Sequence, residues 1–418
     1  MRARVIVTAR LTSVLLIVLT VTLVRADDWP GFRGPSGQGH SAEVGLPLQW
    51  NESENVVWKV PVEGLGWSSP VVADGRLWLT SAVTDGPQRG GSLRLLAFDV
   101  ATGERLVSTE VFEVGDSRAP NPKNSLASPT PVVSGDRVYV HFGAYGTAAL
   151  DLAGDIVWST RFPYVSQHGN GGSPILFRDL LILSCDGYDQ AFIVALDAET
   201  GEVRWKTTRD DPISQAYSTP LLIDVDGRLQ VISIGAFRTN ALDPTTGKEV
   251  WQVGYPDGFS NVPAPAYSAD HGIVFISTGF QQPTLMAVRV DGSGDVTQTH
   301  VAWTLSRGAP LTPSPLVVGN EVYLVTDTGV ATCLDIETGQ VHWRERMGGN
   351  YSASPVYADG RIYFQSEEGV TTVLEPGTTF RELVRNELDG FMLASPAVSD
   401  GSIFIRSVSH LYRLAISQ

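Results

Sequence analysis

The sequence predicts an all-β fold: an eight-bladed β-propeller of four-stranded antiparallel blades, closed by pairing of its N- and C-terminal strands. Two recurring phrases and the spacing between their copies lead to this prediction. The first recurring motif begins with Ser, Thr or Ala followed by proline. An apolar run, a turn and a second apolar run come after it, as in SSPVVADGRLWLT. The other is the hairpin ALDAETGEVRW at residues 195–205, which returns from Ala97, Ala149, Ala241 and Cys333. A segment repeated this often is expected to be architecture rather than an active site.

The anchoring prolines set the period of the repeat. Most neighbouring anchors are 40 to 50 residues apart, and the first step, from Pro70 to Pro131, is 61 residues. Each unit holds two strands after the proline and two in the hairpin, which is the period of a propeller blade. Small residues around each proline suit the crowded axis of such a ring. The anchors are Pro70, Pro131, Pro174, Pro220, Pro265, Pro315, Pro355 and Pro396, so eight blades are expected.

Each residue of the repeated hairpin suits one place in it. Asp197 is expected to open the turn, because its carboxylate can accept backbone N–H groups two and three residues on. Gly201 closes the turn, since glycine takes the left-handed conformation of a bulged hairpin without a steric cost. Trp205 alternates with Val203 along the next strand and is expected to face a neighbouring blade.

The two ends of the chain are expected to share one blade. The last unit, ASPAVSDGSIFIRSVSHLYRLAIS, stops after three strands and lacks the hairpin tryptophan. The segment ENVVWKV precedes the first anchor, so residues 55–60 are expected to form the missing outer strand, with Trp58 in the place of Trp205. Closure of this kind protects terminal strands from fraying and from pairing with other chains.

The first 26 residues read as a secretory signal peptide. A basic region with three arginines precedes an apolar region at residues 11–24, which is short for a bilayer span, and Val24-Arg25-Ala26 is a cleavage site. We expect export to the periplasm or the extracellular space, with cleavage after Ala26; an uncleaved membrane anchor is the alternative. No cysteine follows the apolar region, so a lipoprotein is not expected.

The rest of the chain is expected to form a strap over residues 27–54 and the propeller over residues 55–418, most simply as a monomer. No later segment is long and apolar enough to span a membrane. Removal of residues 1–26 takes away four arginines and no acidic residue, which changes the formal net charge from −15 to −19. Such a charge disfavours phosphate backbones and anionic membranes, so nucleic acid is not an expected partner.

Residue patterns predict neither a metal site nor a known catalytic set. Cys185 and Cys333 lie in separate apolar strand patterns and are expected to be buried free thiols. The histidines show no metal-binding spacing, and the chain has no GxSxG elbow or nucleotide-binding glycine loop. The segments DVDGR (224–228) and DGSGD (291–295) lack the full calcium-loop pattern, so turns are expected there.

The pattern Ala-x-Asp-x-x-x-Gly-x-x-x-Trp resembles the tryptophan-docking motif of pyrroloquinoline quinone (PQQ) repeat propellers. In that family the tryptophan packs onto the next blade near its motif glycine; Val107 replaces it in blade 1. The segment WPGFRGPSGQG (29–39) also resembles a signature of exported bacterial PQQ-like proteins, many described as similar to the outer-membrane assembly lipoprotein BamB. The resemblance implies docking roles for Trp58, Trp158, Trp205, Trp251, Trp303 and Trp343.

The resemblance leaves two functional branches open. Quinoprotein dehydrogenases hold PQQ and a calcium ion and use an Asp base, and many carry adjacent cysteines. This chain has no adjacent cysteines, and their Glu, Asn and Asp calcium ligands find no match in it. BamB-like proteins keep the propeller and bind other proteins, although this chain lacks their lipid-anchor cysteine. No cofactor is therefore expected, and PQQ with calcium belongs to the dehydrogenase alternative.

The connections before the inner strands are expected to converge at one mouth of the central channel. Polar and aromatic groups on such a concave surface are a default binding-site hypothesis, with packing of the blade mouths as the alternative. Arg118 and Lys123 suit an anionic group, and Trp67, Tyr217 and Tyr351 suit a glycan. The candidates are Trp67, Arg118, Lys123, His168, Asn170, Gln215, Tyr217, Asn350 and Tyr351.

We therefore expect an exported, non-catalytic propeller that binds a protein or another cell-envelope partner through its loop-bearing face. A PQQ-dependent dehydrogenase, or another small-ligand enzyme at the channel mouth, is the alternative.

Overall fold

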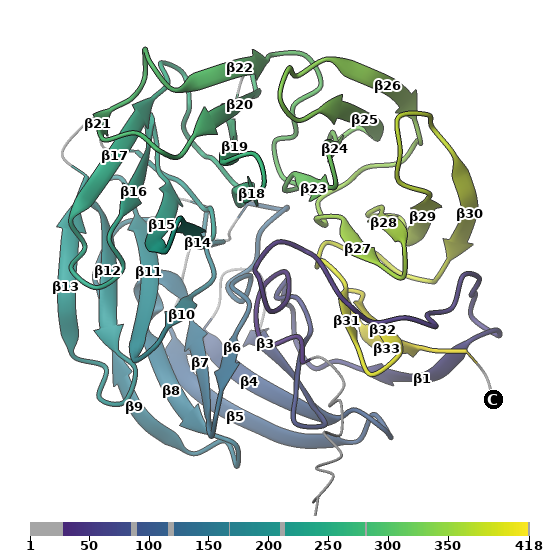
Figure 1. Cartoon of the computed structure of the whole chain (residues 1–418). Helices are drawn as coiled ribbons and strands as arrows, with labels where there is room; N and C mark the ends of the chain where they lie inside the picture. The colour runs from purple at the N-terminus through teal and green to yellow at the C-terminus, as the bar shows by residue number, and fades with distance from the viewer. Residues whose placement is uncertain are drawn as a thin grey trace, which may run out of the picture.

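The chain folds into eight antiparallel sheets arranged as blades around a central axis, as the sequence predicts (Figure 1). The computed structural model describes residues 28–84, 90–115, 121–166, 168–209, 214–280 and 282–416. The predicted signal peptide, residues 1–26, and the candidate Arg118 lie outside these ranges. Within each of blades 1 to 7 the chain runs outward, from the inner strand at the axis to the outer strand.

Blades 1 to 4 follow one another along the first part of the ring. Blade 1 contains β2 (Val71–Ala73), β3 (Arg76–Thr84), β4 (Gly91–Asp99) and β5 (Arg105–Val114). Blade 2 contains β6 (Val132–Ser134), β7 (Arg137–His141), the 3₁₀ turn η1 (Gly143–Tyr145), β8 (Thr147–Asp151) and β9 (Ile156–Thr160). Blade 3 contains β10 (Ile175–Phe177), β11 (Leu180–Asp186), β12 (Ala191–Asp197) and β13 (Val203–Thr208). Blade 4 contains β14 (Leu221–Val225), β15 (Arg228–Ile234), β16 (Arg238–Leu242), β17 (Glu249–Gly254) and β21 (Gly294–Asp295).

Blades 5 to 8 complete the ring. Blade 5 contains β18 (Ala266–Ser268), β19 (Ile273–Thr278), β20 (Thr284–Arg289) and β22 (Val301–Leu305). Blade 6 contains β23 (Leu316–Val318), β24 (Glu321–Val325), β25 (Val330–Asp335) and β26 (Val341–Arg346). Blade 7 contains β27 (Val356–Ala358), β28 (Arg361–Gln365), β29 (Val370–Leu374) and β30 (Glu382–Glu387). Blade 8 contains β31 (Ala397–Ser399), β32 (Ser402–Arg406), β33 (His410–Leu414) and β1 (Val56–Pro61).

The predicted closure by the two ends of the chain is confirmed. Strand β1 pairs antiparallel with β33, with Lys59 opposite Tyr412 and Val60 opposite Leu411. The predicted inner strands are confirmed as well, because each of the eight anchoring prolines directly precedes one of them. Proline suits this place, since it donates no N–H and its fixed φ favours an extended entry into the strand.

The prediction of four strands in every blade is wrong for blade 4. Gly294 and Asp295, which were expected to lie in a turn, pair in parallel with the outer strand β17. The Val296 N–H also donates to the Gln252 carbonyl at 2.9 Å. An insertion from blade 5 thus covers the outer edge of blade 4.

Hydroxyl groups that precede the anchoring prolines tie neighbouring blades together near the axis. The Ser69 N–H donates to Thr130 Oγ1 at 2.9 Å, and the Thr130 N–H donates to Ser173 Oγ at 2.9 Å. The same type of bond joins Ser173 to Thr219, Ala264 to Ser314, Ser314 to Ser354 and Ser354 to Ser395. The Ser and Thr residues at these positions fit the crowded axis, and their hydroxyl groups also accept hydrogen bonds from buried backbone N–H groups.

Five of the six motif tryptophans reach the turn of the next blade. Trp205 Nε1 donates to the Pro244 carbonyl at 3.0 Å, and a Cβ on Gly247 would lie only 2.4 Å from the indole ring. The left-handed backbone of Gly247 (φ 69°) makes the turn, and its missing side chain leaves room for the ring. Equivalent indole bonds run from Trp58 to Val100, Trp158 to Ala198, Trp303 to Ile336 and Trp343 to Gly377.

Trp251 differs from the other motif tryptophans. Its fully buried indole donates to Gln230 Oε1 of its own blade at 2.8 Å, and Gln230 Nε2 in turn donates to the Val290 carbonyl of blade 5. Blade 5 has a stretched hairpin without the motif turn. The contact between Trp251 of blade 4 and blade 5 is therefore made through Gln230. In blade 1, Val107 takes the tryptophan's place, because a Cβ on Gly154 would lie 2.6 Å from Val107 Cγ1.

Residues 28–50 form a strap that crosses one face of the ring close to the axis (Figure 1). Trp29 and Val72 exchange two backbone hydrogen bonds of 2.8 and 2.9 Å, and the Tyr357 N–H donates to the Gly39 carbonyl at 2.8 Å. The side chain of Arg33, itself a strap residue, is buried and donates to the Pro315 carbonyl at 2.8 Å. Burial lowers the pKa of Arg33 to about 9. We call this side of the ring the strap face.

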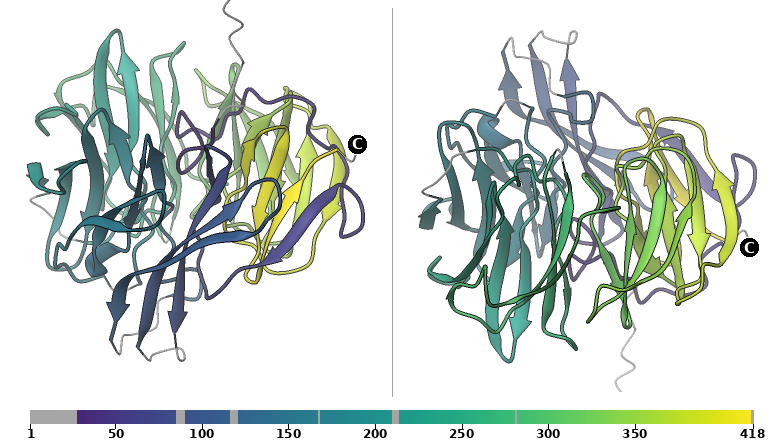
Figure 2. Two further views of the ribbon diagram at one scale, coloured as in Figure 1. Left: turned by 90° about the horizontal axis from the view of Figure 1, so that it is seen from below. Right: turned by 90° about the horizontal axis from the view of Figure 1, so that it is seen from above.

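The opposite side is the loop-bearing face, where the connections between blades and the turns between second and third strands lie. The strands β3, β4 and β5 of blade 1, with 9, 9 and 10 residues, extend beyond the rest of the ring on this side (Figure 2). The apolar core lies between neighbouring blades; between blades 4 and 5, for example, Ile232, Val274 and Val288 are fully buried.

Two further predictions concern buried cysteines and membrane spans. Cys185 and Cys333 are buried free thiols, as predicted. Within the described ranges, no helix has the length and apolar character that crossing a bilayer requires.

Candidate functional site

Lys123 reaches across the axial mouth of the loop-bearing face. It lies on the long connection between blades 1 and 2, yet its ammonium group is 2.9 Å from Glu367 Oε1 of blade 7 and 3.8 Å from Asp327 Oδ1 of blade 6. Its side chain is 45% exposed, whereas the side chains of Glu367 and Asp327 are 6% and 16% exposed. The pair of carboxylates is thus built into the mouth, and the lysine lies over it.

Neighbouring loops hold both carboxylates in place. Ser352 Oγ donates to Glu367 Oε1 at 2.6 Å. Asp327 Oδ2 accepts the Leu311 N–H at 2.8 Å, and Asp327 Oδ1 accepts the Thr312 hydroxyl at 2.6 Å. The sequence analysis did not select Glu367 or Asp327, because both lie in short turns between second and third strands, where acidic residues are common.

The connection that carries Lys123 is fixed independently of the ion pair. Asn124 Nδ2 donates to the His168 carbonyl at 2.8 Å, and Asn124 Oδ1 accepts the Ser125 N–H at 2.8 Å. The Lys123 N–H itself donates to Asn121 Oδ1 at 2.9 Å. The backbone is therefore anchored to the blade 2–3 side of the mouth while the lysine side chain extends to the far side.

A second group of candidates lies on that near side. The rings of His168 and Tyr217 are 6.4 Å apart, and the Tyr217 hydroxyl donates to Gln215 Oε1 at 2.6 Å. Gln215 and Tyr217 are buried, and burial raises the pKa of the Tyr217 hydroxyl well above its ordinary value. These side chains pack beneath the loops rather than open onto the mouth.

The remaining candidates are scattered along the rim. Asn170 Nδ2 donates to the Gly172 carbonyl at 3.3 Å, and Asn350 Nδ2 donates to Glu368 Oε1 at 2.8 Å. Although partial burial acts to raise it, the N–H groups of Asn350 hold the pKa of Glu368 below its ordinary range. Tyr351 is buried, and the half-buried indole of Trp67 meets the edge of Phe391 at 6.5 Å.

The candidates therefore do not form one ring of exposed groups. Pseudo-symmetry places them on equivalent loops, but side-chain length and burial separate them. Tyr217 and Tyr351 do not present their rings as a platform for a glycan, since they are only 8% and 1% exposed. Lys123 pairs with carboxylates of the chain itself rather than standing free for an anionic ligand, and Arg118 lies outside the described residues.

Exposed aromatic side chains form a feature of this face that the sequence analysis missed. Across the described ranges the exposed aromatic residues are Tyr188, Phe280 and Phe391, and all three lie in loops of the loop-bearing face. Phe280 lies 6.2 Å from Phe259, which lies 6.0 Å from Phe237, so three neighbouring loops contribute to one aromatic array. Single aromatic residues in loops carry no periodic signal, which is why the repeat did not mark them.

A hollow of about 390 Å³ lies between loops of blades 5 and 6, beside Asp327. Pro283, Arg307, Leu311, Thr328 and the carboxylate-bearing Asp327 line it. The hollow therefore places Asp327 next to loops of blade 5, the blade that also carries Phe280.

A buried charged network joins blades 3 and 4 below the same face. Arg209 Nε donates to Asp186 Oδ1 at 2.9 Å, and Arg209 Nη2 donates to Ser233 Oγ at 2.6 Å. Burial raises the pKa of Asp186, although the Arg209 guanidinium acts to lower it. The network fastens two blades and lies too deep to contact a ligand.

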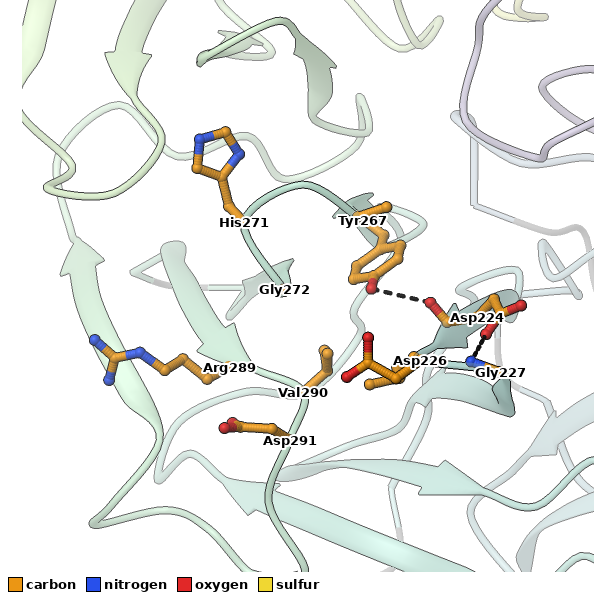
Figure 3. A pocket seen from close by; sticks show the side chains of 11 residues that line it. Asp224, Asp226, Gly227, Tyr267, His271, Gly272, Arg289, Val290 and Asp291 are labelled. Carbon is orange, nitrogen blue, oxygen red and sulfur yellow. Dashed lines mark hydrogen bonds between the residues drawn. The ribbon is translucent and has the colours of Figure 1, made fainter.

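Another hollow, of about 510 Å³, lies on the strap face between blades 4 and 5 (Figure 3). The Tyr267 hydroxyl donates to the Asp224 carbonyl at 3.1 Å, and Asp224 Oδ1 accepts the Gly227 N–H at 2.7 Å, as in a turn. Figure 3 shows the side chains of His271 and Arg289 pointing away from Tyr267. The polar groups do not converge, so this hollow is a poor candidate site.

Comparison with known proteins places this fold in a family. The family model described as outer membrane protein assembly factor BamB matches residues 42–174, 165–293 and 238–379. No curated protein matches the chain by sequence. BamB from Moraxella catarrhalis has a similar structure, with a TM-score of 0.62 and 14% identity over 87% of this chain and 98% of that chain.

Two other solved structures are similar at comparable levels. The computationally designed protein Ika8 has a TM-score of 0.57 and 13% identity over 91% of this chain and 99% of that chain. A europium-containing methanol dehydrogenase has a TM-score of 0.53 and 11% identity over 92% and 90%. At such identities these structures show a shared fold alone. The family model, however, covers most of the chain, from residue 42 to residue 379, and the chain therefore belongs to the family of outer membrane protein assembly factor BamB.

Proposed function

We propose that the chain is a non-catalytic binding or scaffold protein of the cell envelope that docks a partner protein on its loop-bearing face. The observation that carries this proposal is the placement of the exposed aromatic side chains. Tyr188, Phe280 and Phe391 are 48%, 58% and 43% exposed, and all lie on this one face. Aromatic residues are enriched in the cores of protein interfaces, because a large rigid ring buries much apolar area at little entropic cost.

The opposite face supports the same assignment by contrast. There the strap covers the inner strands of several blades, and backbone hydrogen bonds hold it in place. A partner that reached the axis from that side would first have to displace the strap. The loop-bearing face offers its aromatic loops without such a rearrangement.

The family supports a role in the envelope. Its printed description is that of an outer membrane protein assembly factor. Together with the expected signal peptide at residues 1–26, this favours export to the periplasm. The partner we propose is accordingly a protein, and neither nucleic acid nor a glycan.

We further propose that the chain acts without PQQ or calcium. The residues at the axial mouth do not fit that pair, because Ser352, Thr312 and Lys123 already engage the carboxylates of Glu367 and Asp327. Among the described residues, no three His, Cys, Asp or Glu side chains are grouped so that they could hold a metal ion. The dehydrogenase remains the second candidate because a methanol dehydrogenase shares the fold.

A titration separates the two functions. Purified protein without residues 1–26 is titrated with PQQ, with and without calcium, and binding is followed by tryptophan fluorescence and calorimetry. We expect no saturable binding up to high micromolar PQQ. Calcium-dependent binding of one PQQ per chain would contradict the proposal and would favour the dehydrogenase function instead.

A further inference from the structure

Lys123 places a positive charge beside the two carboxylates at the axial mouth. The Glu367 side chain is 6% exposed, and its carboxylate contacts the Ser352 hydroxyl and the Lys123 ammonium group. A buried carboxylate that loses its cation keeps the full desolvation cost without the compensating attraction. A second cation that takes the place of Lys123 would avoid this cost.

Lys123 itself is easier to move than its partners. The lysine side chain is 45% exposed, and its backbone is anchored by Asn121 and Asn124 rather than by the ion pair. The carboxylates, in contrast, are fixed by Ser352, Thr312 and the Leu311 N–H. Glu367 and Asp327 thus form a rigid acidic pair, which we call the cradle. One ammonium group can replace another beside it, because the cation is held less firmly than the carboxylates.

The cradle also opens toward the surface that we assign to the partner. Asp327 forms part of the wall of the hollow of about 390 Å³, and Pro283 at the same hollow follows the loop of the exposed Phe280. At the ion pair itself, two carboxylates face the single ammonium group of Lys123, which leaves an excess of one negative charge there; Arg307 lines the same hollow. A basic side chain that approaches along the aromatic loops is attracted to this excess.

We propose that Glu367 and Asp327 form a recognition site for a lysine or arginine side chain of the docked partner, and that Lys123 occupies this site in the free chain. The inference rests on the proposed function, because the loop-bearing face must dock a partner. Lys123 then acts as an internal competitor. It keeps the carboxylates neutralised until a partner with a basic side chain displaces it.

Chemical rescue tests the site without the partner. In Lys123→Ala the cradle is vacant, and n-butylammonium chloride supplies a small ammonium probe. We expect the probe to raise the melting temperature of Lys123→Ala in a saturable manner, beyond the effect of sodium chloride at equal ionic strength. Wild-type protein should bind the probe at least about tenfold more weakly, because the tethered lysine competes at a high effective concentration.

Matched variants make the outcome decisive. Lys123→Ala/Glu367→Gln removes the buried charge and should abolish the response, whereas Lys248→Ala, on an exposed turn, should behave as wild type. If Lys123→Ala does not fold, Lys123→Met keeps most of the side-chain stem and takes its place. An equal response of the single and double variants, or of Lys123→Ala and wild type, would overturn the proposal. Because these experiments contain no partner, a failure here is separate from a failure of the docking proposal.

Discussion

At the scale of single residues, the buried histidine His141 links the stability of the fold to pH. His141, at the end of β7, is 1% exposed, and its Nδ1 lies 2.8 Å from Thr147 Oγ1. Burial lowers the pKa of His141 from 6.5 to about 4. The imidazole is therefore neutral in the folded chain over a pH range in which it is charged in the unfolded chain.

This shift predicts a loss of stability in acid. A depressed pKa stabilises the folded state fully above the unfolded value of 6.5, and that contribution disappears as the pH falls toward about 4. A shift of this size corresponds to about 3 kcal/mol. We expect the free energy of unfolding, measured by denaturant titration at several pH values, to fall by roughly this amount more in wild type than in His141→Thr.

Threonine is a suitable replacement, because blade 1 carries Thr80 at the equivalent place. Thr80 lies two residues after Trp78, the partner of Ala97, and His141 lies two residues after Tyr139, the partner of Ala149. The variant starts from a lower stability if the smaller side chain leaves a void. Stability curves of the two proteins that stay parallel from neutral pH to pH 4 would show that His141 does not titrate in this way.

At the scale of elements, the repeated hairpin works as a fastener between blades. The carboxylate of Asp197 accepts the N–H groups of Glu199 and Thr200 at 3.0 and 2.9 Å, which shapes the turn as the sequence predicts. The turn then presents a glycine to the tryptophan of the preceding blade, and Gly201 lies against Trp158. The hairpin of blade 3 thus docks Trp205 on blade 4 and receives Trp158 from blade 2.

The close approach at Gly247 gives a test of this fastener. Gly247→Ala would place a Cβ 2.4 Å from the ring of Trp205, at a φ of 69°. Gly227→Ala has the same backbone cost at a φ of 80° but meets no atom within 4 Å. We expect Gly227→Ala to lose about 1–2 kcal/mol of stability and Gly247→Ala to lose about 1–3 kcal/mol more, since the ring must shift. Equal losses in thermal or denaturant unfolding would mean that the tryptophan contact contributes little.

The sequence predicts these elements well because each of them is local. A proline, an apolar run and a turn lie within a few residues of one another, so the inner strands, the hairpins and the outer strand around Trp58 can be derived from a single copy of the repeat. Strand β21 escapes prediction because its pairing with β17 joins a turn of blade 5 to the outer edge of blade 4. Nothing within DGSGD itself indicates that edge.

The candidate site is predicted less well for the same reason. The sequence makes Lys123 a candidate residue of the channel mouth, but its partners Asp327 and Glu367 lie in turns of blades 6 and 7, far along the chain. The length of a lysine side chain and the direction of a loop decide such contacts, and neither follows from the repeat. Burial of Gln215 and Tyr351 likewise depends on how neighbouring loops cover them.

At the scale of the whole molecule, the ring has two unequal faces. The strap closes one face, and its Trp50 stacks on Tyr363 at 6.2 Å before the chain enters the closing strand β1. The other face carries the aromatic loops, the extended strands of blade 1 and the axial cradle with Lys123. A closed ring of this kind holds the loops on a stiff frame, which favours docking of a partner with little rearrangement.

Site-specific photo-cross-linking tests this assignment of the faces most directly. A photoreactive benzoyl-phenylalanine replaces Phe280 or Phe391 on the loop-bearing face, and Val44 on the strap or Val203 on an outer strand as controls, all of them exposed. After irradiation in cells that produce the protein, we expect a discrete protein adduct from the Phe280 and Phe391 positions and none from the controls. Adducts from Val44 or Val203, with none from Phe280 and Phe391, would contradict docking through the loop-bearing face.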